Sequence, residues 1–166
     1  MELLDANSGC IMTNSKILVN VFEPTEDMFI IEDIAHALSH ECRFGGHLPR
    51  FYSVAQHSVN CMLNVSSEHK LAALLHDASE AYLRDIPTPI KTRLSGYKEL
   101  EDAIMTVIAS KFKFQWPMSK EVKEVDSYML NVEWDNLVKS NNPNFKTYTP
   151  ETARAEFLIA YEKLTK

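Results

Sequence analysis

Apolar residues recur at helical spacing through most of the chain. The pattern predicts helices over residues 31–40, 68–83 and 100–112, each with one face suited to burial. In the second of these, the expected core face consists of Leu71, Leu74, Leu75 and Ala78. Most of the chain is therefore expected to pack as amphipathic helices.

Capping residues predict where three further helices begin. Ser53 is placed to cap a helix that runs to about residue 64, and Ser119 one that runs to about residue 139. Thr149 followed by Pro150 is the favoured order of a cap and a first helical residue, and predicts the last helix.

The first 25 residues follow a different pattern. Two short β-prone runs, residues 10–12 and 17–22, flank the polar turn 13–16, which predicts a hairpin. Paired glycines make residues 42–47 a loop, and two prolines make residues 85–90 irregular.

Together these elements predict a mainly α fold. We expect one domain over residues 1–166, a compact bundle of about six helices with a small N-terminal β-hairpin. Its parts would be the hairpin at 1–25, a helical core at 30–140 and a C-terminal helix at 149–165.

Charge and composition narrow the class of protein. The chain has 17 basic and 23 acidic residues, a formal net charge of −6, which argues against binding a nucleic-acid polymer. No apolar run reaches the roughly 18 residues of a membrane span, and the first ten residues do not resemble a signal peptide. Three widely spaced cysteines do not suggest a disulfide framework. A cytoplasmic protein is expected.

The strongest chemical signal is the His76-Asp77 pair in an otherwise apolar segment. On a continuous helix these side chains would lie about 100° apart, and Glu80 would share their face. Burying such charges is costly unless they are paired or bind a metal ion. A polar, solvated helix edge is the alternative.

Two residues elsewhere could complete a metal site. His57 lies on the helix that Ser53 caps, and Asp126 on the helix that Ser119 caps. Each alone could be an ordinary core or surface residue. Together with His76 and Asp77 they form a nitrogen and oxygen ligand set that suits a divalent ion: Mn, Co, Fe, Ni, Mg or Zn.

The order His57, His76-Asp77, Asp126 resembles the H…HD…D signature of the HD-domain metal-dependent phosphohydrolases. The glycine loop at 42–47, the segment 51–58 and the DIPTPIK run at 85–91 are similar to the branch that holds YfbR-type 5′-deoxynucleotidases and DatZ-type bacteriophage dATP triphosphohydrolases. The resemblance covers roughly residues 10 to 135.

The resemblance implies roles for eight residues. His57, His76, Asp77 and Asp126 would bind the metal ion. Glu80 would act as acid and base beside the attacking water, and Asp85 would be a second catalytic carboxylate. Arg43 and Lys91 would contact phosphate. Each of these four also has a plainer interpretation, as a loop or surface residue.

The implied function is hydrolysis of a deoxynucleotide 5′ phosphate ester, releasing deoxynucleoside plus phosphate or triphosphate. Two alternatives stay open: an HD phosphohydrolase of cyclic or signalling nucleotides, and a non-catalytic helical binding module with a vestigial metal site. The resemblance also implies a homo-oligomer, a dimer or larger. No membrane or nucleic-acid partner is expected.

Overall fold

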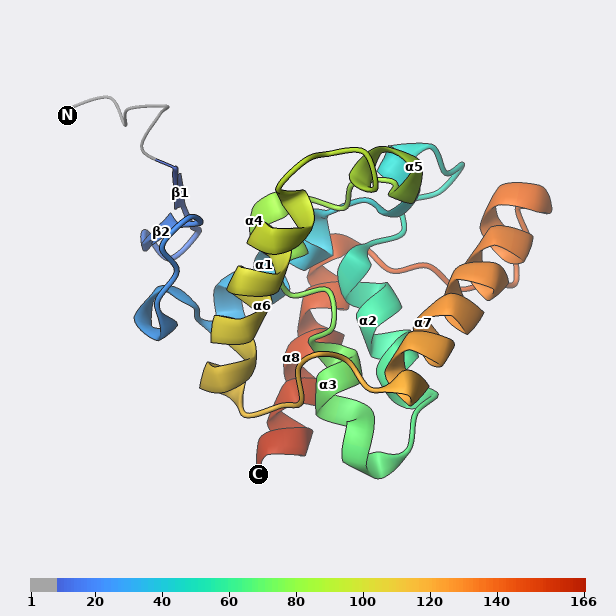
Figure 1. Cartoon of the computed structure of the whole chain (residues 1–166). Coiled ribbons are helices and arrows are strands. Elements are labelled where there is room, and N and C mark those ends of the chain that lie inside the picture. The colour runs from blue at the N-terminus through green and yellow to red at the C-terminus, as the bar shows by residue number, and fades with distance from the viewer. Residues whose placement is uncertain (1–8) are drawn as a thin grey trace.

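A computed structural model describes residues 9–166 (Figure 1). It is mainly helical, with one two-stranded antiparallel sheet, so the predicted fold class is confirmed. The longer helices are α1 (Ile31–His40), α2 (Val54–Leu63), α6 (Tyr97–Phe112), α7 (Lys120–Glu133) and α8 (Pro150–Thr165). The short helices are α3 (Lys70–Leu74), α4 (Glu80–Leu83) and α5 (Thr88–Lys91). In the described part of the chain no helix is long and apolar enough to cross a membrane.

The predicted hairpin is present; its first strand has the expected bounds, and its second strand is shorter than the run 17–22. Strand β1 (Cys10–Met12) pairs with β2 (Leu18–Asn20), and Ile11 lies opposite Val19. The hairpin lies at one side of the helical body (Figure 1). It is joined to that body by the amide of Ser15, which donates to Asp33 of α1 over 2.9 Å.

All three predicted caps are formed. The side chains of Ser53, Ser119 and Thr149 each accept a hydrogen bond from the backbone amide three residues later. Such a bond satisfies one of the amides that a helix start leaves unpaired. The helix ends of α2, α7 and α8 are thus determined locally.

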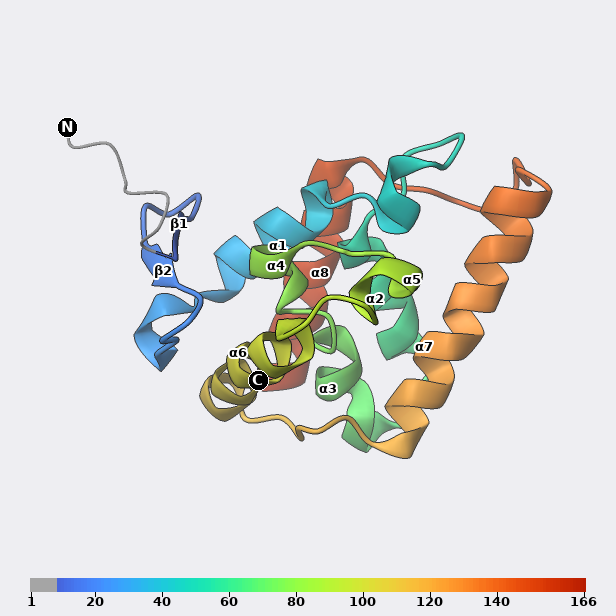
Figure 2. The same cartoon turned by 45° about the horizontal axis from the view of Figure 1, so that its top comes forward.

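Helix α8 lies at the centre of the molecule, where it packs against α1, α2 and α3. Figure 2 shows it behind α1 and α4, with α7 standing at the opposite edge from the hairpin. Its residue Phe157 is fully buried, as are Ile34 of α1 and Leu74 of α3. The C-terminal helix is therefore an integral part of the core.

The prediction of one helix over residues 68–83 is wrong. Helix α3 ends at Leu74, residues 75–79 form a turn, and α4 begins at Glu80. The Nδ1 atom of His76 lies 2.7 Å from the carbonyl oxygen of Ala73, an oxygen that an uninterrupted α-helix would offer to the amide of Asp77. The apolar residues still face the core, because turn bonds between residues three apart preserve nearly the same periodicity.

Other boundaries differ from expectation as well, and α6 begins at Tyr97, before the expected residue 100. A single turn of helix, α5, interrupts the segment expected to be irregular, because Pro89 lies in its first turn, where a missing amide costs little. Helix α7 ends at Glu133 and continues as the π-helix η4 (Trp134–Lys139), within the single helix expected there.

Candidate metal centre and its cavity

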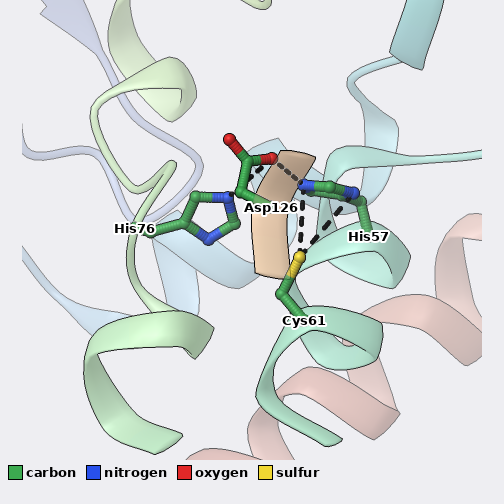
Figure 3. A group of neighbouring side chains, drawn as sticks. All are labelled: His57, Cys61, His76 and Asp126. Carbon is green, nitrogen blue, oxygen red and sulfur yellow. Dashed lines mark hydrogen bonds and ion pairs between the residues drawn. The ribbon is translucent and has the colours of Figure 1, made fainter. Parts of the chain in front are cut away.

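The four predicted metal ligands converge from three parts of the fold. His57 comes from α2, His76 and Asp77 from the turn after α3, and Asp126 from α7. Figure 3 shows the rings of His57 and His76 directed toward Asp126. Because His76 and Asp77 lie on a turn, the geometry expected of a continuous helix does not apply to them.

Two of the four distances between these donor atoms are close to the ligand spacing around a single ion, and the other two are longer. Oδ1 of Asp126 lies 3.1 Å from Nε2 of His57 and 3.7 Å from Nε2 of His76. Oδ2 of Asp77 lies 3.8 Å and 3.1 Å from the same two nitrogens. Bonds of about 2.1 Å place adjacent ligands about 3.0 Å apart in an octahedron and about 3.4 Å apart in a tetrahedron.

Both histidines direct Nε2 toward this centre. Nδ1 of His57 faces a carboxylate oxygen of Glu133 at 2.6 Å, and Nδ1 of His76 faces a backbone carbonyl. Both partners accept, so each Nδ1 carries a proton and the neutral ring has its lone pair on Nε2. Nε2 of His76 is shielded from solvent and, apart from its ion-pair contacts with Asp77 and Asp126, has no hydrogen-bond partner among the described residues. The donor set fits a metal ion.

A group of four residues, His57, Cys61, His76 and Asp126, could hold a metal ion, with all ligand atoms within 4.8 Å of one another. The sulfur of Cys61 lies 3.5 Å from Nε2 and 4.0 Å from Nδ1 of His57. Because the sulfur is at similar distances from both nitrogens, it packs against the side of the His57 ring. A metal ion bound by Nε2 would lie in the ring plane, beyond that nitrogen. Asp77 is outside this group, although its Oδ2 lies 3.8 Å and 3.1 Å from Nε2 of His57 and His76.

A cavity of about 780 Å³ opens beside this centre. Six of the eight predicted site residues line it, and the two histidines lie behind its floor, almost fully buried. These six are Arg43, Asp77, Glu80, Asp85, Lys91 and Asp126. The lining also includes apolar residues: Phe44, Pro87, Leu130, Trp134 and Val138. The cavity size is that of small-molecule sites in general.

Two carboxyl groups on the wall are held in an environment that favours protonation. Burial, with the charges of Asp77 and Asp85, raises the pKa of Glu80 well above its ordinary value, against the effect of Lys91 and Arg43. Burial also raises the pKa of Asp85. Perturbed carboxyl groups of this kind are typical of catalytic sites and also occur in structural ion-pair networks.

The two predicted cations both line the cavity, and each is paired with a different acidic residue. Arg43 is buried and pairs with Glu133, and its Nη1 lies 3.9 Å from Asp77. Lys91 pairs closely with Glu101 of α6 and lies 3.8 Å from Glu80. Both side chains are thereby held at the cavity.

Neither Glu133 nor Trp134 is identified as a site residue from the sequence. Glu133 is fully buried beside His57, whereas Trp134 is 45% exposed and lines the cavity with Phe44, their ring centres 6.0 Å apart. One signal was available: Glu133 follows Asp126 by seven residues, two helical turns, and so shares its face. Nothing local indicated that Trp134 would face a cavity.

A second histidine pair, His36 and His40, lies on α1. Their rings lie 4.4 Å apart on α1, and Nδ1 of His40 contacts the carbonyl oxygen of His36. Neither residue belongs to the metal-binding group.

No protein-family model matches the chain. It is 49% identical over 112 residues to the uncharacterized protein YfdR of Escherichia coli (strain K12), an alignment that covers 68% of this chain and 63% of YfdR. The chain thus spans less than two thirds of that relative's length. It is also 31% identical over 133 residues to the uncharacterized protein RCAP_rcc00048 of Rhodobacter capsulatus, covering 72% of this chain and 68% of that protein. By this similarity, the chain belongs to the same family as RCAP_rcc00048.

Proposed function

We propose that the protein is a metal-dependent phosphohydrolase of the HD-domain type that cleaves deoxynucleotide 5′ phosphate esters. The products would be a deoxynucleoside and phosphate, or triphosphate when a dNTP is the substrate. One observation carries the proposal: the donor atoms of the four expected ligands meet at the floor of a cavity whose wall holds the four other expected site residues.

His57, His76, Asp77 and Asp126 are the proposed ligands of one divalent ion. We choose Asp77 over Cys61 because its oxygen lies 3.1 Å and 3.8 Å from the two Nε2 atoms, on the cavity side. When bound, the ion supplies positive charge that polarises a phosphoryl oxygen and makes a nearby water more acidic. The candidate ions are Co, Mn, Zn, Mg, Fe and Ni.

Glu80 is the proposed proton acceptor for the attacking water. In its carboxylate form Glu80 is a stronger base than an exposed glutamate, because its pKa is raised, and one of its oxygens, Oε2, has no hydrogen-bond partner among the described residues. The water oxygen forms a new bond to phosphorus as the ester P–O bond breaks. The proton taken by Glu80 then passes to the leaving 5′ oxygen, directly or through Asp85.

Arg43 and Lys91 are the proposed phosphate contacts. Their cationic groups offset the negative charge of a bound phosphate, which the carboxyl groups of Asp77, Glu80 and Asp85 would otherwise repel. The apolar lining residues, Phe44 and Trp134 among them, suit the base and sugar. A nucleotide thus matches both the charged and the apolar lining of the cavity.

The test is chromatographic detection of products. The protein is incubated with each dNMP and dNTP while Co²⁺, Mn²⁺, Mg²⁺ or Zn²⁺ is added in turn. Deoxynucleoside should appear only with metal, and Asp77→Ala should reduce its rate by at least about 100-fold. The exposed acidic residue Glu124 of α7 provides the control, because Glu124→Ala should leave the rate unchanged.

The products distinguish the possible substrates. Deoxynucleoside released directly from dNTPs, most strongly from dATP, would indicate a triphosphohydrolase, and release from dNMPs alone a 5′-deoxynucleotidase. No release from any dNMP or dNTP would contradict the proposal and direct attention to cyclic and signalling nucleotides. Metal binding that raises the melting temperature without turnover of any nucleotide would identify a binding module.

A further inference from the structure

Glu133 is a buried carboxylate to which the proposed mechanism assigns no role. It is the last residue of α7 and is 0% exposed. A charge in such a position is costly unless it is paired and hydrogen-bonded. Its contacts therefore indicate why it is tolerated.

Each side chain around the Glu133 carboxylate is a hydrogen-bond donor. Nδ1 of His57 donates to Oε1 over 2.6 Å, and the hydroxyl of Tyr52 donates to the same oxygen over 2.8 Å. Arg43 donates to Oε2, with Nε at 3.2 Å and Nη2 at 3.1 Å. The carboxylate thus binds a proposed metal ligand through one oxygen and a proposed phosphate contact through the other.

We propose that Glu133 is the positioning residue that joins the metal centre to the anion-binding side of the cavity, an inference that rests on the proposed metal site. By accepting from Nδ1, it holds His57 in the tautomer whose Nε2 can bind an ion and makes that nitrogen more basic. By pairing with Arg43, it fixes the guanidinium at the cavity wall. Loss of the carboxylate should therefore weaken both metal binding and phosphate binding.

The test variant is Glu133→Gln. The glutamine side chain has nearly the same size as glutamate. Because all three partners of Glu133 are donors, the glutamine amide nitrogen must face a donor in either orientation of the amide. Calorimetric titration with Mn²⁺ should show an affinity about 10- to 100-fold lower than that of the wild-type protein. Titration of inorganic phosphate into the Mn²⁺-saturated protein should also show at least about a tenfold loss.

Tyr52→Phe is the matched control. It removes one hydrogen bond from the same oxygen but leaves the carboxylate in contact with His57 and Arg43. Both affinities should stay within about threefold of the wild-type values. Circular dichroism of the metal-free variants checks that each is folded.

Several results would overturn the inference. A folded Glu133→Gln variant whose metal and phosphate affinities match those of Tyr52→Phe, with only a lower melting temperature, would show a merely structural role. If Glu133→Gln does not fold, ¹⁵N NMR of the histidines in the Zn²⁺-loaded wild-type protein decides. A proton on Nδ1 of His57 with zinc on Nε2 supports the inference, and the opposite tautomer overturns it.

None of these measurements needs turnover. If metal and phosphate affinities fall as expected while no nucleotide is hydrolysed, the proposed reaction is wrong and the role of Glu133 stands. If the wild-type protein binds no metal ion, the role of Glu133 is wrong as well.

Discussion

At the scale of single residues, the cavity gathers carboxyl groups, and the pKa values of two of them, Glu80 and Asp85, are raised by burial and by nearby negative charge. Asp77, Glu80 and Asp85 share one wall, and burial and mutual repulsion act against the charged forms of Glu80 and Asp85. Such groups lower the stability of the folded protein at neutral pH, as is common where function and stability compete.

Glu80→Gln should therefore stabilise the metal-free protein in a pH-dependent way. The folded-state pKa of Glu80 is raised, so between the unfolded and folded pKa values the folded state holds a proton that the unfolded state has lost. Stability is therefore lost as pH rises through that window. The glutamine of the variant does not titrate, so its unfolding free energy does not fall in this way. It should exceed that of the wild-type protein by about 1 kcal/mol at pH 7 and be nearly equal to it at pH 4. Urea unfolding in the presence of a chelator measures both differences; a gap that does not grow with pH would contradict the explanation.

The fourth ligand can also be decided by substitution. If Asp77 binds the ion and Cys61 only packs against His57, Asp77→Asn should weaken Mn²⁺ binding by more than about 100-fold, whereas Cys61→Ala should change it by less than about threefold. Calorimetry provides both affinities. A larger effect of Cys61→Ala would assign the sulfur to the metal instead.

At the scale of secondary-structure elements, the site depends on interruptions as much as on helices. The turn at 75–79 separates α3 from α4 and carries His76 and Asp77. In the loop before α2, Phe44 has a positive φ of 56°, a conformation that costs a non-glycine residue roughly 1–3 kcal/mol and is concentrated at functional sites. It places the Phe44 ring beside Trp134 at the cavity.

The start of α7 should contribute to stability without contributing to the metal site. Ser119→Ala removes the cap that accepts from the amide of Val122 and should cost about 1 kcal/mol of unfolding free energy. Asp126 lies about two turns further along, so Mn²⁺ affinity should not change. Ser127→Ala on the same helix, at an exposed position, should be neutral or slightly stabilising. A change in metal affinity in Ser119→Ala would show that the first turn of α7 helps to position Asp126.

At the scale of the whole molecule, α8 unites segments that are distant in sequence. It packs against α1, α2 and α3, and so supports the helix that carries His57 and the one that precedes His76. The ligand set therefore depends on a segment that supplies no ligand.

Phe157→Ala should therefore destabilise the protein by about 3–5 kcal/mol, since the side chain is fully buried in the core. Ile159→Ala, two residues along the same helix and 46% exposed, should cost less than about 1 kcal/mol. Denaturant unfolding compares the two variants. Similar costs would mean that α8 is a peripheral helix.

The amino-acid sequence by itself determined the features that depend on neighbouring residues. Helical periodicity, the caps at Ser53, Ser119 and Thr149, and the turn of the hairpin are local interactions, and each could be predicted. The eight candidate site residues were also selected from sequence, through a resemblance between motifs. Their roles remain predictions, whereas their convergence is a property of the structure.

Only the tertiary structure decided the features that depend on contacts between distant segments. Glu133 contacts His57, which is 76 residues away in the sequence, and Arg43, which is 90 residues away. Local sequence patterns carry no information about contacts between residues so far apart in the chain. The break after Leu74 escaped prediction because apolar spacing stays nearly helical through the turn, while a side-chain contact of His76 replaces the regular bond. Which polar groups lie in the cavity, and which are buried behind it, follows from how α2, α7 and the turn pack together around one point.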